Sequence, residues 1–205
     1  MIHEPSEAGC DARPMAWFPD TSALVTLAVH PPLQRAVAAA LSVHNLVLVE
    51  SVVSELKGLA GTSDPAAAWA GTALGQLDWL GEPVRVDDPV GTQLAVELQE
   101  LIAGGRPLTH DMQHYGEAAI ISLASRAQRL QPVMLSDDYD APVAAKNRNV
   151  EPFSVHKLLH LMINQSKMTA AQAASFADAL QAANRAQDYT AAELTSGRLG
   201  RVGQP

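Results

Sequence analysis

The sequence predicts an α/β fold with a mainly parallel central sheet and helices on both of its faces. Short apolar stretches of strand character alternate with longer stretches that repeat apolar residues every three to four positions, as amphipathic helices do. The chain has 205 residues, of which 47% are hydrophobic, and this is enough for one substantial core. No apolar run reaches the roughly 18 residues that a membrane span requires, and the N-terminus does not resemble a signal peptide. We therefore expect a cytoplasmic protein, which its single cysteine, Cys10, also suits.

The first half of the chain shows this alternation. The apolar stretch 16–19 predicts a buried strand, and the helix that follows is expected to break at Pro31 and Pro32, because proline cannot continue a helix interior. The β-branched stretch NLVLVES predicts a second strand, and the next helix stops at Gly61. An Asp–Pro pair, Asp64 and Pro65, then starts a helix with apolar residues at three to four spacing. The expected strands are 16–19, 45–51 and 83–86, and the expected helices are 21–43, 51–61, 64–81 and 89–103.

The second half continues after the break GGRPLTHD. The expected elements are helix 112–129, strand 132–136, helix 140–147, strand 150–154 and helices 155–164 and 169–186. The last two helices carry apolar stripes that must pack against the domain or against a second copy. The predicted organisation is a domain at 16–153, a helical extension at 154–186 packed on it, and loose termini at 1–15 and 187–205.

Acidic residues stand where such a fold places its sites, beyond the carboxyl ends of the strands. Asp20 directly follows the first expected strand and precedes a helix, so it is a natural N-cap. A cap uses one carboxylate oxygen and leaves the other for a metal ion. Asp20 is therefore expected to cap the helix and also to serve as a ligand.

Two glutamates lie on expected helices. Glu55 falls at the edge of an apolar arc beside Leu59, where it is either a solvated surface residue or part of a site. Glu117 falls between Ile120 and Ala124, on the face that points inward. An inward carboxylate needs compensation by a metal ion, a cationic side chain or a raised pKa.

Three acids, Asp137, Asp138 and Asp140, follow the strand 132–136. A helix cap needs only one of them. At a separation of about 4 Å and an effective dielectric constant near 20, two such charges repel by about 4 kcal/mol. A cation would offset this repulsion, and carboxylates with water are the ligands of hard cations such as Mg²⁺ or Mn²⁺.

Together these motifs resemble the acidic quartet of PIN-domain ribonucleases. The resemblance runs through Asp20 in FPDTSAL, Glu55 in VVSELKGL, Glu117 in YGEAAIISLA and the Asp pair in MLSDDYDA, in this order. It covers about residues 16–153 and implies a PIN-like three-layer α/β/α domain. By analogy, Asp20, Glu55, Glu117 and Asp138 would be the catalytic, metal-binding acids, with Asp137 or Asp140 able to take the fourth place.

The resemblance also implies a function and partners. It implies hydrolysis of RNA with Mg²⁺ or Mn²⁺, as in toxins of the VapC kind, which form homodimers and pair with a small antitoxin. The residues expected near the RNA are Ser22, Ser136, His114 and Arg148. The alternative is a catalytically silent PIN-like module that binds protein or RNA.

The distribution of charge and the sequence motifs indicate which other kinds of site the chain could contain. Residues 1–145 hold 7 basic and 18 acidic side chains and residues 146–205 hold 7 and 4, so a basic surface could lie beside the acidic site. No Ser-His-Asp set, cysteine nucleophile with an obvious base or phosphate-binding loop is evident. A histidine metal site at His110 and His114 would require the helix to begin before Asp111.

Overall fold

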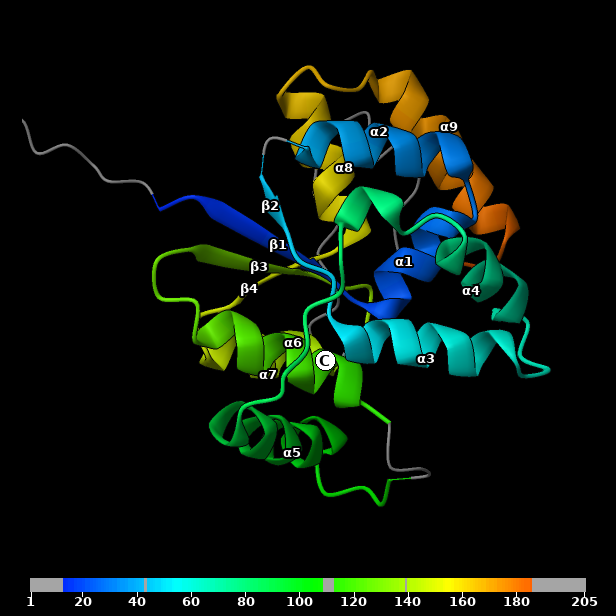
Figure 1. Ribbon diagram of the computed structural model, residues 1–205. Coiled ribbons are helices and arrows are strands. Elements are labelled where there is room, and N and C mark those ends of the chain that lie inside the picture. Colours follow the sequence, from blue (N-terminus) through cyan, green and yellow to red (C-terminus); the bar gives the residue numbers. More distant parts are fainter. Residues whose placement is uncertain (1–12, 43, 109–112, 139, 186–205) are drawn as a thin grey trace, which may run out of the picture.

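The computed structural model describes residues 13–42, 44–108, 113–138 and 140–185. Within these residues the chain forms an α/β fold around a parallel sheet of four strands in the order β2-β1-β3-β4, so the predicted fold class is confirmed (Figure 1). The strands are β1 (Met15–Pro19), β2 (Asn45–Leu46), β3 (Gln131–Leu135) and β4 (Glu151–Phe153). The helices are α1 (Thr21–Ala28), α2 (Pro31–Leu41), α3 (Glu50–Ala60), α4 (Ala67–Leu74), α5 (Pro89–Ala103), α6 (Tyr115–Ser125), α7 (Ala141–Asn147), α8 (Val155–Asn164) and α9 (Ala170–Ala182).

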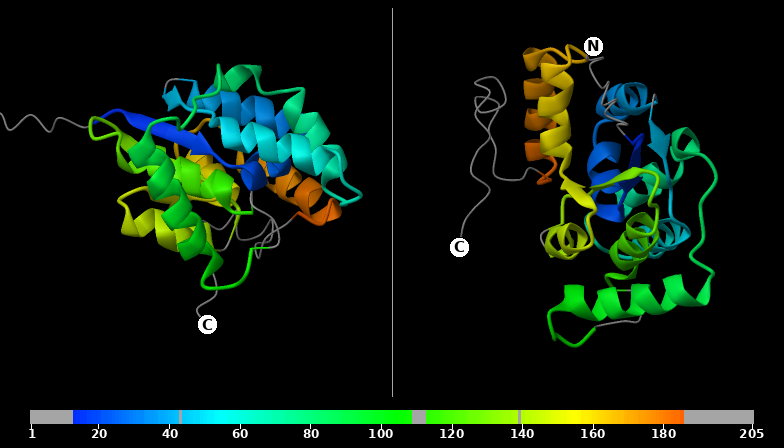
Figure 2. Two further views of the ribbon diagram at one scale, coloured as in Figure 1. Left: turned by 60° about the horizontal axis from the view of Figure 1, so that its bottom comes forward. Right: turned by 90° about the vertical axis from the view of Figure 1, so that its left-hand side faces the viewer.

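Helices cover the sheet on both faces. Alternate residues of a strand point to opposite faces, so Phe18 packs into one apolar cluster with α3, α4, α6 and α7, while Trp17 packs into a second with α2, α8 and α9. Figure 1 shows α3, α6 and α7 below the sheet, α4 to its right, and α2, α8 and α9 above it. Helix α5 lies outside α6, against which it packs (Figure 2). The result is the three-layer arrangement expected from the alternating sequence.

Several helices begin where the sequence offers a side-chain cap, among them α1, α2 and α9. The imidazole of His30 accepts a hydrogen bond from the Leu33 N–H (3.2 Å), and this cap separates α2 from α1 at the predicted proline break. Thr169 and Gln172 form a reciprocal capping box at the start of α9. Apolar side chains of α8 and α9, including Leu158 and Phe176, are buried in the second cluster. The region 154–185 therefore contributes to the core on this face of the sheet.

Two expected strands are shorter than predicted. The stretch 45–51 pairs as a strand only at Asn45–Leu46, and Glu50 already begins α3. The stretch 83–86 forms only an isolated parallel bridge between Val84 and Val49. Pro83 has no backbone N–H, so it cannot donate to a sheet ladder, and the bridge at Val84 lies outside the four strands of the sheet.

Several helix ends also differ from the prediction. The helix expected at 112–129 spans Tyr115–Ser125, the one expected at 64–81 divides into α4 and a 3₁₀ turn at Asp78–Leu80, and α9 ends at Ala182. The predictions for Cys10, His110, most of the N-terminal segment 1–15 and all of 187–205 lie outside the described residues. In the part of the chain that the structure describes, the helices are too short or too polar to cross a membrane.

Candidate metal centre

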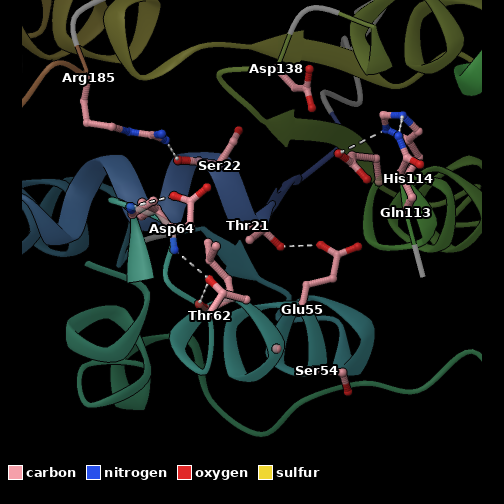
Figure 3. Close-up of a pocket in the computed structure, with 15 residues that line it drawn as sticks. Thr21, Ser22, Ser54, Glu55, Thr62, Asp64, Gln113, His114, Asp138 and Arg185 are labelled. Carbon is pink, nitrogen blue, oxygen red and sulfur yellow. Dashed lines mark hydrogen bonds and ion pairs between the residues drawn. The ribbon is translucent and has the colours of Figure 1, made fainter. Parts of the chain in front are cut away.

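Four carboxylates from four separate parts of the chain meet at the carboxyl end of the sheet. Asp20 follows β1 and Asp138 lies just beyond β3, while Glu55 comes from α3 and Glu117 from α6. Glu55, Glu117 and Asp138 line a pocket of about 730 Å³ (Figure 3). The charge of Glu117 interacts with those of Glu55, Asp20 and Asp138. We call these four residues the acidic cluster.

Asp20 is both a helix cap and a buried member of the acidic cluster. Its Oδ1 accepts a hydrogen bond from the Ala23 N–H (2.7 Å), which caps α1, and the Ser22 hydroxyl donates to Oδ1 and Oδ2 at 2.9 and 3.0 Å. Only 1% of Asp20 is exposed. Burial raises the pKa of Asp20 from 3.8 to about 7, although hydrogen bonds from Ala23, Ser136 and Ser22 act in the opposite direction. A nearby cation would favour the ionised form.

Glu117 is the most strongly perturbed acid. Its side chain is 12% exposed, and its Oε2 is buried without a hydrogen-bond partner. Burial, followed by repulsion from Glu55, Asp20 and Asp138, raises the pKa of Glu117 from 4.5 to about 9. The expected inward orientation is therefore observed, and the compensation that it requires is not supplied by a hydrogen bond to Oε2.

Glu55 is held between three helices. Its Oε2 accepts a hydrogen bond from the Thr21 hydroxyl on α1 (2.5 Å), and its Oε1 accepts one from the Gly116 N–H at the start of α6 (2.8 Å). A Cβ atom at Gly116 would lie 2.6 Å from Cδ and 2.7 Å from Oε1 of Glu55, so the carboxylate fits only against a glycine. Of the two interpretations open for Glu55, the structure excludes a solvated surface residue.

The three acids after β3 separate in space. Asp138 offers an oxygen within 4.8 Å of ligand atoms of His114 and Glu117. Asp137 instead accepts a hydrogen bond from the Val155 N–H at the start of α8 (3.0 Å), and burial raises its pKa. Asp140 forms an ion pair with Arg106 (2.6 Å). Asp137 and Asp140 are thus engaged with other groups, and among the described residues the atoms that could share one ion come from His114, Glu117 and Asp138.

The two serine hydroxyls that were expected near the substrate form hydrogen bonds with the aspartates around them. Ser22 donates to Asp20 and also accepts a hydrogen bond from the Asp137 N–H (2.9 Å). The Ser136 hydroxyl is buried, bonds to Asp20 and accepts from the Asp138 N–H at 3.0 Å. Both serines therefore fix the positions of acids, Ser22 also lines the pocket, and their contact with the substrate stays a prediction.

Of the two residues His114 and Arg148, which were expected near the RNA, only His114 lies among the described residues that line the pocket. His114 lines the pocket, and its Nδ1 lies 4.0 Å from Oε1 of Glu117. Arg148 is exposed at the end of α7 and does not line the pocket, so its expected place at the site is not observed. Sequence reasoning missed Arg185, whose side chain lines the pocket from the end of the C-terminal extension. No motif surrounds Arg185, and its position depends on how α9 packs.

The donor set fits a hard divalent cation. Most of its donor atoms are carboxylate oxygens. His114, Glu117 and Asp138 offer atoms close enough to share one ion, and the buried Oε2 of Glu117 lacks a hydrogen-bond partner. Mg²⁺ and Mn²⁺ prefer such oxygen-rich sites. Cation binding would also offset the repulsion within the acidic cluster.

Comparisons of the chain with protein-family descriptions, with curated proteins and with solved structures find no match. What the site does must therefore be inferred from its own residues.

Proposed function

We propose that this chain is a Mg²⁺- or Mn²⁺-dependent ribonuclease that hydrolyses phosphodiester bonds at the acidic cluster. The observation that carries the proposal is the convergence of four acids from distant segments, three of which line one pocket, with the Oε2 of Glu117 buried and unpartnered. Structural carboxylates are normally paired with cations or hydrogen-bond donors, so an unpartnered one at the end of a parallel sheet favours a metal-binding role.

Each acid has a role that follows from its contacts. Asp20, Glu117 and Asp138 would hold the cation, with His114 beside them. Glu55 adds negative charge and fixes the start of α6 through the Gly116 N–H. These residues would hold a cation that, when bound, would supply charge neutralisation at a phosphate, activation of water for in-line attack and stabilisation of the leaving oxygen. The pocket has no need of a nucleophilic side chain for this reaction.

The test is cleavage of single-stranded RNA by the purified full chain. We expect cleavage with Mg²⁺ or Mn²⁺, none with a chelator, and loss of activity in Asp20→Asn and Asp138→Asn. Asp140→Asn is the matched control, because Asp140 pairs with Arg106 outside the acidic cluster. Cleavage that survives Asp20→Asn or the chelator would refute the proposal, and metal-independent RNA binding without cleavage would favour the silent binding module.

The resemblance to VapC-like toxins extends the proposal to partners. A small antitoxin would inhibit the enzyme by covering the pocket, and the active form would be a homodimer. Growth arrest on expression, relieved by Asp138→Asn, together with a dimer on size-exclusion chromatography, tests this extension. Ribonuclease activity from a monomer that does not impair growth would contradict the toxin assignment and leave the ribonuclease assignment standing.

A further inference from the structure

The pocket has an unequal distribution of charge. Among the described residues that line it, four are acidic, namely Glu55, Asp64, Glu117 and Asp138, and one is a permanent cation, Arg185. RNA carries a negative charge at every nucleotide, so it approaches this acidic surface against repulsion unless cations offset it. A bound metal ion acts at the acidic cluster. Arg185 stands elsewhere in the pocket.

The chain directs Arg185 into the pocket through a turn at the end of α9. Asn184 adopts a left-handed conformation (φ 55°), which asparagine tolerates better than most residues, and the Arg185 N–H bonds to the Leu180 carbonyl at 2.8 Å. The side chain then reaches α1, where Nη2 donates to the Ser22 carbonyl at 3.2 Å and to the Thr26 hydroxyl at 3.3 Å. Figure 3 shows it reaching Ser22 from the side of the pocket away from His114.

The hydrogen bonds of Arg185 leave part of its binding capacity unused. Both bonds use Nη2, both are long for a guanidinium, and both acceptors are uncharged. Its Nε is buried without a partner. The charge of Arg185 also lowers the pKa of Asp137, which lies behind Ser22 and which burial otherwise raises. A guanidinium has five donors, and within the described part of the chain those of Arg185 bond to uncharged acceptors alone, so this side chain suits a phosphate group.

We propose that Arg185 binds an RNA phosphate adjacent to the one that is cleaved, so that the helices α8 and α9 complete the substrate site. This inference rests on the proposed ribonuclease function. It assigns to the C-terminal extension the positive charge that the sequence suggested for Arg148. The competing role for Arg185 is that of a clamp that only ties α9 to α1.

The experiment measures RNA binding separately from cleavage. A fluorescent single-stranded RNA is titrated with the full chain in Ca²⁺ in place of Mg²⁺, and a gel afterwards checks that the RNA is intact. Dissociation constants are measured over a range of salt concentrations for the wild type, Arg185→Gln, Arg185→Lys and Arg35→Gln. Arg35 is an exposed arginine on α2 and serves as the matched control.

Arg185→Gln is expected to weaken binding about tenfold or more, because a charge-assisted hydrogen bond is lost. It should also reduce the slope of log affinity against log salt by about 0.7, the value for one phosphate contact to a single strand. Arg185→Lys should keep the slope, and Arg35→Gln should match the wild type in both quantities.

The outcomes separate the two hypotheses. An unchanged salt slope in Arg185→Gln, with a lower melting temperature, would identify a clamp and overturn the inference. Equal weakening by Arg35→Gln would overturn it as well, because the effect would then be one of total charge. If the wild type binds no RNA at all, the proposed function itself fails.

Discussion

Replacement of Glu117 by glutamine should stabilise the metal-free protein while eliminating its activity. Glu117 is nearly buried, its Oε2 has no hydrogen-bond partner, and its carboxylate faces the charges of Glu55, Asp20 and Asp138. A neutral amide of almost the same shape removes this repulsion. It cannot replace the anionic oxygen that we assign to the cation.

The size of the effect follows from the pKa of Glu117, which rises from 4.5 to about 9 on folding. Between these values the unfolded chain has released the proton and the folded chain keeps it, so stability falls as pH rises, by up to about 1.4 kcal/mol per pH unit. Between about pH 5.5 and pH 8, Glu117 therefore lowers the free energy of unfolding of the wild type by about 3 kcal/mol. The glutamine variant does not show this decrease. Asp20 adds a similar loss between its unfolded pKa of 3.8 and its folded pKa of about 7 in both proteins.

The assay is urea unfolding in a chelator at pH 5.5 and pH 8, with free energies of unfolding extrapolated to water. The free energy of the wild type should fall more steeply with pH than that of Glu117→Gln, by about 3 kcal/mol over this range. Glu100→Gln, an exposed position on α5, is the control and should follow the wild type. Parallel pH profiles for the wild type and Glu117→Gln would refute a crowded acidic cluster.

Three further predictions concern the cation, the glycine beside Glu55 and the extension. At about 100 times its Kd, Mn²⁺ should stabilise the wild type by about 2.7 kcal/mol in thermal unfolding, and Asp138→Asn should lose most of this gain; equal shifts would place the ion elsewhere. Gly116→Ala should lower the free energy of unfolding by about 1–3 kcal/mol, because its Cβ would overlap the Glu55 carboxylate, whereas Gly71→Ala on α4, with open space around it, should not. Truncation after Pro152 should give aggregates on size-exclusion chromatography, because it uncovers the apolar face that α8 and α9 bury; a soluble and fully active monomer would contradict this.

Local rules in the sequence were sufficient to place two members of the acidic cluster, Asp20 and Glu117, whereas Glu55 and Asp138 were assigned through the family resemblance. Asp20 follows an apolar strand and caps a helix, and Glu117 lies on the inward arc of its own helix, so neither inference required knowledge of distant contacts. The alternation of strands and helices likewise predicted a parallel sheet, and parallel strands bring their carboxyl ends to one edge.

The remaining details depend on contacts between distant segments. Asp137 and Asp138 are neighbours of one type, and contacts with distant segments, among them the Val155 N–H at the start of α8, hold Asp137 outside the pocket lining. Arg185 binds the Ser22 carbonyl across 163 positions of sequence. The left-handed turn at Asn184 that directs it there was not predicted from any sequence pattern. The strand at 45–51 was too long in the prediction for the same reason, because pairing partners beyond Leu46 are set by tertiary structure.

Because β1 pairs in parallel with β3, this part of the sheet can form only after a long stretch of the newly made chain has been synthesised. The Asp137 N–H bonds to the Ser22 hydroxyl across 115 residues, so the environment of Asp20 is incomplete until that length has been synthesised. At typical translation rates this takes roughly 6 to 23 s. During this time the apolar strand β1, MAWFP, lacks its partner β3. Asp138 and Arg185 both lie in the later part of the chain, so a product terminated before residue 138 lacks both and cannot complete the acidic cluster.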